Sequence, residues 1–183
     1  MKRILVLLLT LCAFNIAQAQ NRAFTISYGD VTSDVEDTSV EATGWRVDLL
    51  FESFAKGGKL AHGLGIGWIE TSADYTPVAQ TFNYTLTSLP IYYAPKFIFG
   101  QKAFKGFIKG ALGLHFSEYE RKSTLGTVTA DDTGFYGGVS VGASFAFNPK
   151  VFVNLEYEWD YLSNSYYKDE SIESIILGIG FKM

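Results

Sequence analysis

Large apolar residues alternate with small or polar residues along most of the chain after Arg22. In one clear case, Val153, Leu155 and Tyr157 alternate with Asn154 and Glu156. A period of two is typical of β-strands, whose successive side chains point to opposite faces. The pattern recurs in eight segments: 24–28, 45–52, 63–68, 81–99, 108–116, 138–147, 151–161 and 175–182. The sequence therefore predicts an all-β fold of eight strands.

The fourth segment is less regular than the others. Pro90 and Pro95 each lack a backbone donor, which predicts a bulge or a local break in the ladder. Two sets of apolar residues compete there for one face, so the orientation of the strand stays open: Leu89, Ile91 and Tyr93 against Leu86 and Tyr92.

The predicted connections alternate between short turns and long loops. The short turns carry Gly, Asn or Pro at 55–59, 100–102 and 148–150. The long loops cover 30–42, 71–80, 119–132 and 162–171. Short turns at one end and long loops at the other are typical of outer-membrane barrels, in which the turns face the periplasm.

The face opposite the large apolar residues is small and charged. It is rich in Gly, Ala and Ser and carries six charged residues that we expect to form a network inside the barrel: Arg46, Asp48, Lys109, Glu156, Glu158 and Asp160. Glu52 and Lys96 are expected on the same side. Small and charged residues suit a narrow lumen, whereas large apolar residues suit lipid. The pattern thus predicts an eight-stranded antiparallel up-and-down transmembrane β-barrel, with a soluble lipocalin-like barrel as the alternative.

The first residues have the pattern of a secretory signal peptide. Lys2 and Arg3 precede an apolar stretch at 4–14, and Ala17 and Ala19 form a small-x-small cleavage site. The apolar stretch is shorter than the roughly 20 residues that a membrane helix needs. We therefore predict a signal peptide followed by one barrel domain.

The predicted boundary divides the chain into a signal peptide at 1–19 and a barrel at 20–183. Cleavage removes Cys12, the single cysteine, and leaves 13 basic against 19 acidic residues, a formal net charge of −6. This balance argues against nucleic acid as a partner. The acidic loop at 30–41 lacks the spacing of a calcium loop, and whether it binds Ca²⁺ or Mg²⁺ stays open.

All three tryptophans fall on the predicted lipid face near the loop ends of their strands. Trp45 begins the second segment, Trp68 ends the third, and Trp159 lies late in the seventh. Such positions predict an aromatic girdle at one membrane interface.

The chain resembles the small outer-membrane barrels of the OmpA-transmembrane and OmpX type, within the porin family. The resemblance rests on the strand pattern and on the final alternation of Ile175, Leu177, Ile179 and Phe181, although Lys182 and Met183 follow where the family commonly ends on an aromatic residue. It implies a place in the outer membrane of a Gram-negative bacterium. It also implies contact with outer-membrane lipid and lipopolysaccharide, and with the barrel-assembly machinery during biogenesis.

These features predict a non-enzymatic barrel with a structural or surface-interaction role, in which the charged lumen is plugged and the loops meet an unknown surface ligand. A narrow pore for ions or small solutes is the alternative. His115 and Ser117 resemble two residues of the lipid A deacylases and are the candidates for a lipid A-modifying enzyme. No cofactor is expected, and no residues are predicted as metal ligands.

Overall fold

The computed structural model describes residues 21–35, 40–77, 81–101, 103–164, 166–167 and 170–183. The predicted signal peptide, with Ala17 and Ala19, lies outside the described residues.

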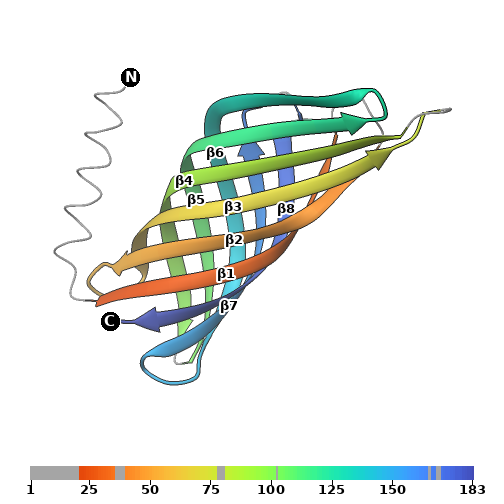
Figure 1. Cartoon of the computed structure of the whole chain (residues 1–183). Coiled ribbons are helices and arrows are strands. Elements are labelled where there is room, and N and C mark those ends of the chain that lie inside the picture. Colours follow the sequence, from red (N-terminus) through yellow and green to blue (C-terminus); the bar gives the residue numbers. More distant parts are fainter. Residues whose placement is uncertain (1–20, 36–39, 78–80, 102, 165, 168–169) are drawn as a thin grey trace, which may run out of the picture.

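Eight antiparallel strands form a closed barrel, in which each strand pairs with its neighbours in sequence (Figure 1). Pairing of the first and last strands closes the ring, with Ala23 opposite Lys182. The strands are β1 (Asn21–Asp34), β2 (Glu41–Phe54), β3 (Leu60–Tyr75), β4 (Phe82–Gln101), β5 (Phe104–Ser123), β6 (Gly126–Ala146), β7 (Val151–Leu162) and β8 (Ser171–Lys182). The predicted fold class is confirmed.

Several strands are longer than the sequence predicted. The segment 119–132, predicted as a loop, is instead mostly β-hairpin, because β5 runs to Ser123 and β6 starts at Gly126. Gly126 has a positive φ of 143°, which L side chains rarely adopt and glycine accepts. The extension was missed because its residues are exposed on both faces, so no apolar alternation marks it.

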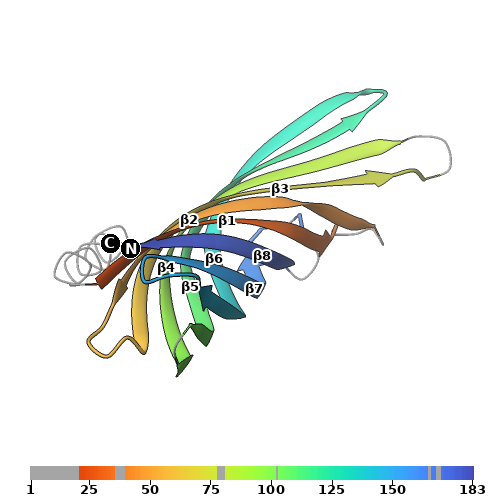
Figure 2. The same cartoon turned by 90° about the horizontal axis from the view of Figure 1, so that it is seen from below.

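The long strands carry part of the sheet beyond the rest of the barrel. Figure 2 shows the β3–β4 and β5–β6 hairpins reaching past the ends of the other strands. Pairing continues to Tyr75–Phe82 between β3 and β4, and to Ser123–Gly126 between β5 and β6. Since β4 and β5 also pair out to Asn83, the four strands form one protruding sheet.

The two prolines of β4 interrupt the ladder without shifting its register. Pairing with β3 is absent opposite Pro90 and pairing with β5 is absent opposite Pro95, yet the same alignment resumes beyond each gap. Backbone N–H groups an odd number of residues apart point to opposite neighbours, which explains why the two gaps face different strands. The prediction of a local break is confirmed, and the register contains no bulge.

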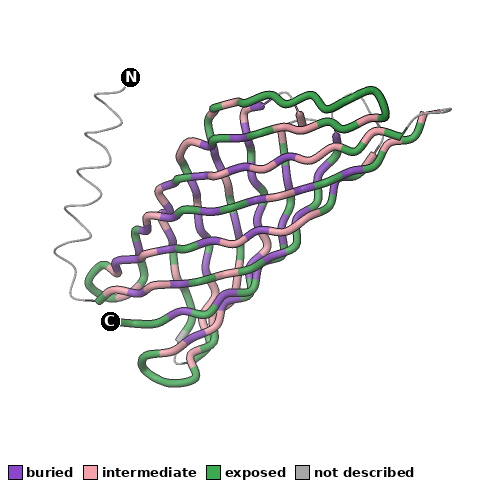
Figure 3. Tube along the Cα trace, viewed as in Figure 1, coloured by how far each residue is buried: buried purple, intermediate pink, exposed green. Residues whose placement is uncertain are grey.

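Buried and exposed residues alternate along most of the strands (Figure 3), as expected where successive side chains point to the lumen and to the outer surface; the first half of β6 is an exception. The outer surface carries large apolar residues such as Leu155, Ile175 and Leu177, which are 56%, 59% and 62% exposed. In β4, Leu86 and Tyr92 point inward, which settles the orientation left open by the sequence. Among the described residues, no helix is long and apolar enough to cross a lipid bilayer.

Candidate functional site: the lumen and its two ends

Arg46 of β2 lies at the centre of the lumen and is completely buried. Its Nε and Nη2 donate to the two carboxylate oxygens of Asp48 at 2.8 and 2.9 Å. Its Nη1 donates to Asp160 of β7 at 2.5 Å and to Ser174 of β8 at 3.3 Å. A two-pronged contact of this kind matches the planar guanidinium to a carboxylate, and it fixes the orientation of both groups. Arg46 therefore links three walls of the barrel.

Two buried tyrosines complete the shell around Arg46. The Tyr136 hydroxyl lies 2.8 Å from Asp160 Oδ1 and 3.2 Å from Glu158 Oε1. The Tyr92 hydroxyl donates to Asp48 at 3.2 Å, and the two rings contact each other with centroids 5.3 Å apart. Their hydroxyls supply donors to carboxylates that Arg46 alone does not satisfy.

Lys109 of β5 is the second buried cation of the network. Its Nζ donates to Glu158 at 2.8 Å and forms an ion pair with Glu156. Glu158 also lies 3.7 Å from Arg46 Nη2, so this carboxylate joins the two cations. The structure thus brings all six charged residues predicted for the lumen into one connected network.

The network fills the middle of the barrel. The cavity beside Asp48, Tyr92, Lys109 and Glu156 has a volume of about 10 Å³, room for about one water molecule. Eight strands enclose an interior just wide enough for side chains, and here the side chains occupy it. A separate ion pair, Lys96 to Glu52 at 2.5 Å, lies nearer the turn end.

Tyr136, Tyr92 and Ser174 are the members of this network that the sequence analysis did not select. Tyr136 is 0% exposed and touches both acidic residues of β7 that bind Arg46. The sequence did indicate its position: Tyr136 and Ser140 are four residues apart in one strand, so both side chains point to the same face, the lumen. It was overlooked because a large aromatic residue was expected on the lipid face.

His115 and Ser117 lie together near the loop end of the lumen. His115 Nδ1 is 2.8 Å from Ser117 Oγ, Ser117 Oγ is 2.6 Å from Ser88 Oγ, and His115 Nε2 is 3.2 Å from the Ser163 carbonyl. The imidazole is 0% exposed and Ser117 is 5% exposed. A nucleophile must reach its substrate. This pair faces inward, away from the lipid acyl chains that a deacylase would cleave.

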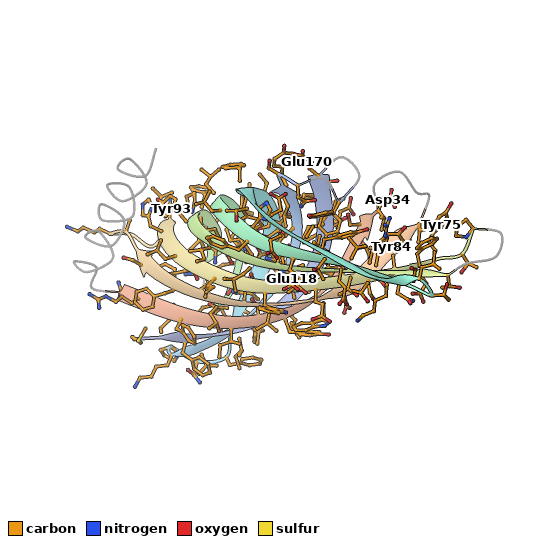
Figure 4. All side chains as sticks on the ribbon, turned by 45° about the horizontal axis from the view of Figure 1, so that its top comes forward. Asp34, Tyr75, Tyr84, Tyr93, Glu118 and Glu170 are labelled. Carbon is orange, nitrogen blue, oxygen red and sulfur yellow. The ribbon has the colours of Figure 1, made fainter. Side chains whose placement is uncertain are left out.

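Aromatic residues cover the loop end of the lumen. The rings of Tyr119 and Tyr166 stack with centroids 4.4 Å apart and planes 5° apart. In the β7–β8 connection, the Tyr167 hydroxyl lies 2.8 Å from Thr71 Oγ1, and burial raises the pKa of Tyr167. In Figure 4, Tyr84 and Tyr75 lie toward this end of the barrel and Tyr93 toward the other.

The three tryptophans all face outward. Trp68 and Trp159 are 42% and 46% exposed, and Trp45 is half-buried. Trp159 packs edge-on against Tyr157, with centroids 4.4 Å apart. The aromatic girdle stays a prediction, since these positions do not locate the membrane boundary. No group of three or more potential ligands that could hold a metal occurs in the described ranges.

A closed antiparallel barrel with an apolar exterior and a polar interior is the architecture of a transmembrane β-barrel protein. The sequence matches the family described as outer membrane protein beta-barrel domain over residues 4–182. The chain belongs to this family, and it resides in the outer membrane of a Gram-negative bacterium. The alternative of a soluble lipocalin-like barrel is therefore wrong.

Solved structures from several organisms share the fold. Neisserial surface protein A has a TM-score of 0.66 and 15% identity, with 88% of this chain and 97% of that chain covered. Ail, the attachment invasion locus protein of Yersinia pestis, has a TM-score of 0.61 and 15% identity, with 91% and 100% covered. A major outer membrane protein from Thermus thermophilus has a TM-score of 0.53 and 12% identity, with 88% and 99% covered. A comparison with curated proteins finds no match.

Proposed function

We propose that this protein is a non-enzymatic, non-conducting barrel that presents its protruding sheet to a surface partner. The observation that carries the proposal is the free outer edge of β6. Strand β7 pairs with β6 only from Tyr136 onward, and the described residues provide no strand partner for the edge that precedes it. The partner that fits such an edge is an extended polypeptide segment, which pairs through its backbone.

The direction of the backbone groups along this edge follows from the hydrogen bonds further down the strand. The Ser163 amide donates to the Phe135 carbonyl, so odd-numbered residues of β6 direct their backbone groups toward β7. The Ala146 amide donates to Ala103, so even-numbered residues face β5. Because directions alternate in a regular strand, Thr127, Thr129 and Asp131 direct N–H and C=O groups away from the sheet. Unpaired backbone groups of this kind recruit another strand.

The charge of the edge favours a basic partner. Asp131 lies opposite Glu118 in the register, and both side chains are exposed. Asp132 is adjacent and accepts a hydrogen bond from the Thr133 amide at 2.7 Å. Cationic side chains on an incoming strand would meet these carboxylates, which adds orientation to backbone pairing.

The test measures binding of a basic peptide with alternating Lys and Val to the full chain in lipid nanodiscs. We expect the peptide to slow amide hydrogen exchange at Thr127, Thr129 and Asp131. The double variant Thr129→Pro/Asp131→Pro removes two outward donors and leaves the β5 ladder intact, so the affinity should fall roughly tenfold, given about 0.5–1.5 kcal/mol for each hydrogen bond.

The matched control is Thr129→Ala/Asp131→Ala, which removes the side chains and keeps both amides. Its affinity should exceed that of the proline variant, because the backbone provides most of the contact. Absence of amide protection, or equal affinity of the two double variants, would overturn the proposal. Retained heat-dependent gel mobility confirms that each variant is a closed barrel.

A further inference from the structure

The turn end of the barrel holds a second, larger space. A cavity of about 390 Å³ lies between the turns and the ion pair of Lys96 with Glu52. Its volume is within the range of small-molecule sites. Because short turns of outer-membrane barrels face the periplasm, this vestibule opens to the periplasm. It is separate from the protruding sheet at the other end of the strands.

The side chains that line the vestibule carry a net positive charge. Its lining contains four basic side chains and one acidic side chain: Arg22, Lys96, Lys105, Lys182 and Glu52. Lys96 is neutralised by Glu52, whereas Lys105 and Lys182 have no ion-pair partner among the described residues. Like charges that share a partly enclosed space repel each other. An anion bound between them would relieve this repulsion.

The floor of the vestibule carries a polar group without a partner. Asn154 is 5% exposed, and its Oδ1 forms no hydrogen bond within the part of the chain that the structure describes. A buried amide left unsatisfied costs about 1–3 kcal/mol, so such groups normally meet a ligand or water. Asn154 lines both the vestibule and the narrow central cavity. Its side chain is therefore placed to contact a molecule that enters from the periplasm.

The walls between the charges are apolar and aromatic. Lys182 Nζ lies 5.8 Å from the centroid of the Phe152 ring, and Lys96 Nζ lies 4.7 Å from that of Phe107. Lys96 is buried beside Phe107, whereas Lys182 is exposed to solvent and open to an entering ligand.

We propose that the periplasmic vestibule is a binding site for a small anion that carries more than one phosphate group. Lys105 of β5 and Lys182 of β8 bind the anionic groups from opposite parts of the wall, and Asn154 contacts the ligand at the floor. Two separated ammonium groups favour two linked phosphates over one.

The test is a calorimetric titration of inorganic pyrophosphate into the full chain in phosphatidylcholine nanodiscs. We expect saturable binding that is tighter than that of inorganic phosphate. The double variant Lys105→Gln/Lys182→Gln should weaken it at least tenfold. Lys122→Gln, which removes one charge at the opposite end of β5, should bind as the parent does. A single variant, Asn154→Val, should weaken binding several-fold and provides a second test if the double variant fails to fold.

The same titration in nanodiscs that contain cardiolipin, whose headgroup carries two phosphates, separates two sources of the ligand. Weaker apparent pyrophosphate binding there would identify a lipid headgroup as a competitor, and unchanged binding would identify a soluble ligand; either result supports the site. No pyrophosphate binding to the parent chain, or equal binding by the folded double variant, would overturn it.

Discussion

Arg46 and Asp160 are 114 positions apart in the chain, yet Arg46 Nη1 lies 2.5 Å from Asp160 Oδ2 in the centre of the lumen. The contact joins β2 to β7 across the barrel, between walls that do not pair through their backbones. Both side chains are fully buried. The pair therefore constrains the cross-section of the barrel as well as filling it.

Replacing Arg46 by Met should strongly destabilise the barrel. The substitution leaves Asp48 and Asp160 buried without their cation, and removal of one partner of a buried ion pair costs about 3–5 kcal/mol. The free energy of unfolding, measured by urea titration in lipid vesicles, should fall by that amount. The control is Lys122→Met, which breaks an exposed pair with Glu120 and should cost about 0–1 kcal/mol. Similar losses for both variants would contradict the importance of the buried network.

Replacement of two strand glycines by alanine should change the stability of the barrel in different ways. A Cβ at Gly44 would lie 1.8 Å from the backbone oxygen of Glu70, so β2 and β3 would have to separate. We expect Gly44→Ala to lose about 3 kcal/mol of unfolding free energy, since overpacking displaces backbone. A Cβ at Gly110 meets nothing closer than Pro95 Cγ at 3.6 Å, so Gly110→Ala should be neutral or gain about 0.5–1 kcal/mol. Thermal or urea midpoints of both variants check the contrast.

A charge on the lipid face should cost stability only within the membrane. Leu177 lies in the middle of β8 and points outward with 62% exposure. Leu177→Arg should reduce the unfolding free energy in lipid vesicles by about 2–4 kcal/mol. Leu125, 89% exposed between β5 and β6, lies beyond the barrel wall, and Leu125→Arg should have little effect. An unchanged stability of Leu177→Arg would contradict a lipid-facing position.

The sealed lumen should prevent ion flow. We expect the refolded chain to carry no stable discrete current in a planar bilayer, because side chains fill its centre. The double variant Arg46→Ala/Tyr136→Ala removes the two largest fully buried side chains of the described residues and should give measurable openings where it still folds. Discrete openings of the parent chain would favour the narrow pore instead, and charge reversal at Lys109 should then alter ion selectivity.

The buried His115 and Ser117 should have no catalytic effect on lipid A. Overexpression of the chain should leave the lipid A mass spectrum unchanged, because Ser117 faces the lumen and not the acyl chains of the membrane. Ser117→Ala should give the same spectrum. Loss of an acyl chain on overexpression, abolished by Ser117→Ala, would show that the protein is an enzyme.

The barrel and the residues of its lumen could be predicted from the sequence, because both follow from the alternation of apolar and polar residues along each strand. In β7, every inward position from Asn154 to Asp160 is polar and every outward one is apolar or aromatic, so orientation follows from the residue types. Arg46 and Lys109 could be placed inside in the same way. Their partners could not be chosen, since pairing across the lumen depends on strand tilt and not on separation in the chain.

The protruding sheet could not be predicted for the opposite reason. Between Glu120 and Thr133 both faces meet solvent, so the residue types do not alternate and the sequence does not distinguish a strand from a loop. The orientation of β4 was ambiguous because Tyr92 is aromatic and faces inward. A tyrosine suits both the lipid face and the lumen, because its ring makes apolar contacts and its hydroxyl can donate a hydrogen bond, here to Asp48.

The seam between β1 and β8 has a consequence for the order of events in biogenesis. Strand β1 is the first of the eight strands to be synthesised, and β8, which closes the ring against it, is the last. Until both are present, each retains an open hydrogen-bonding edge and a large apolar surface, which together favour aggregation. Closure also requires contacts between distant parts of the chain, which form slowly. The barrel can therefore close only after β8 has been made, and a chain that lacks β8 keeps both edges open.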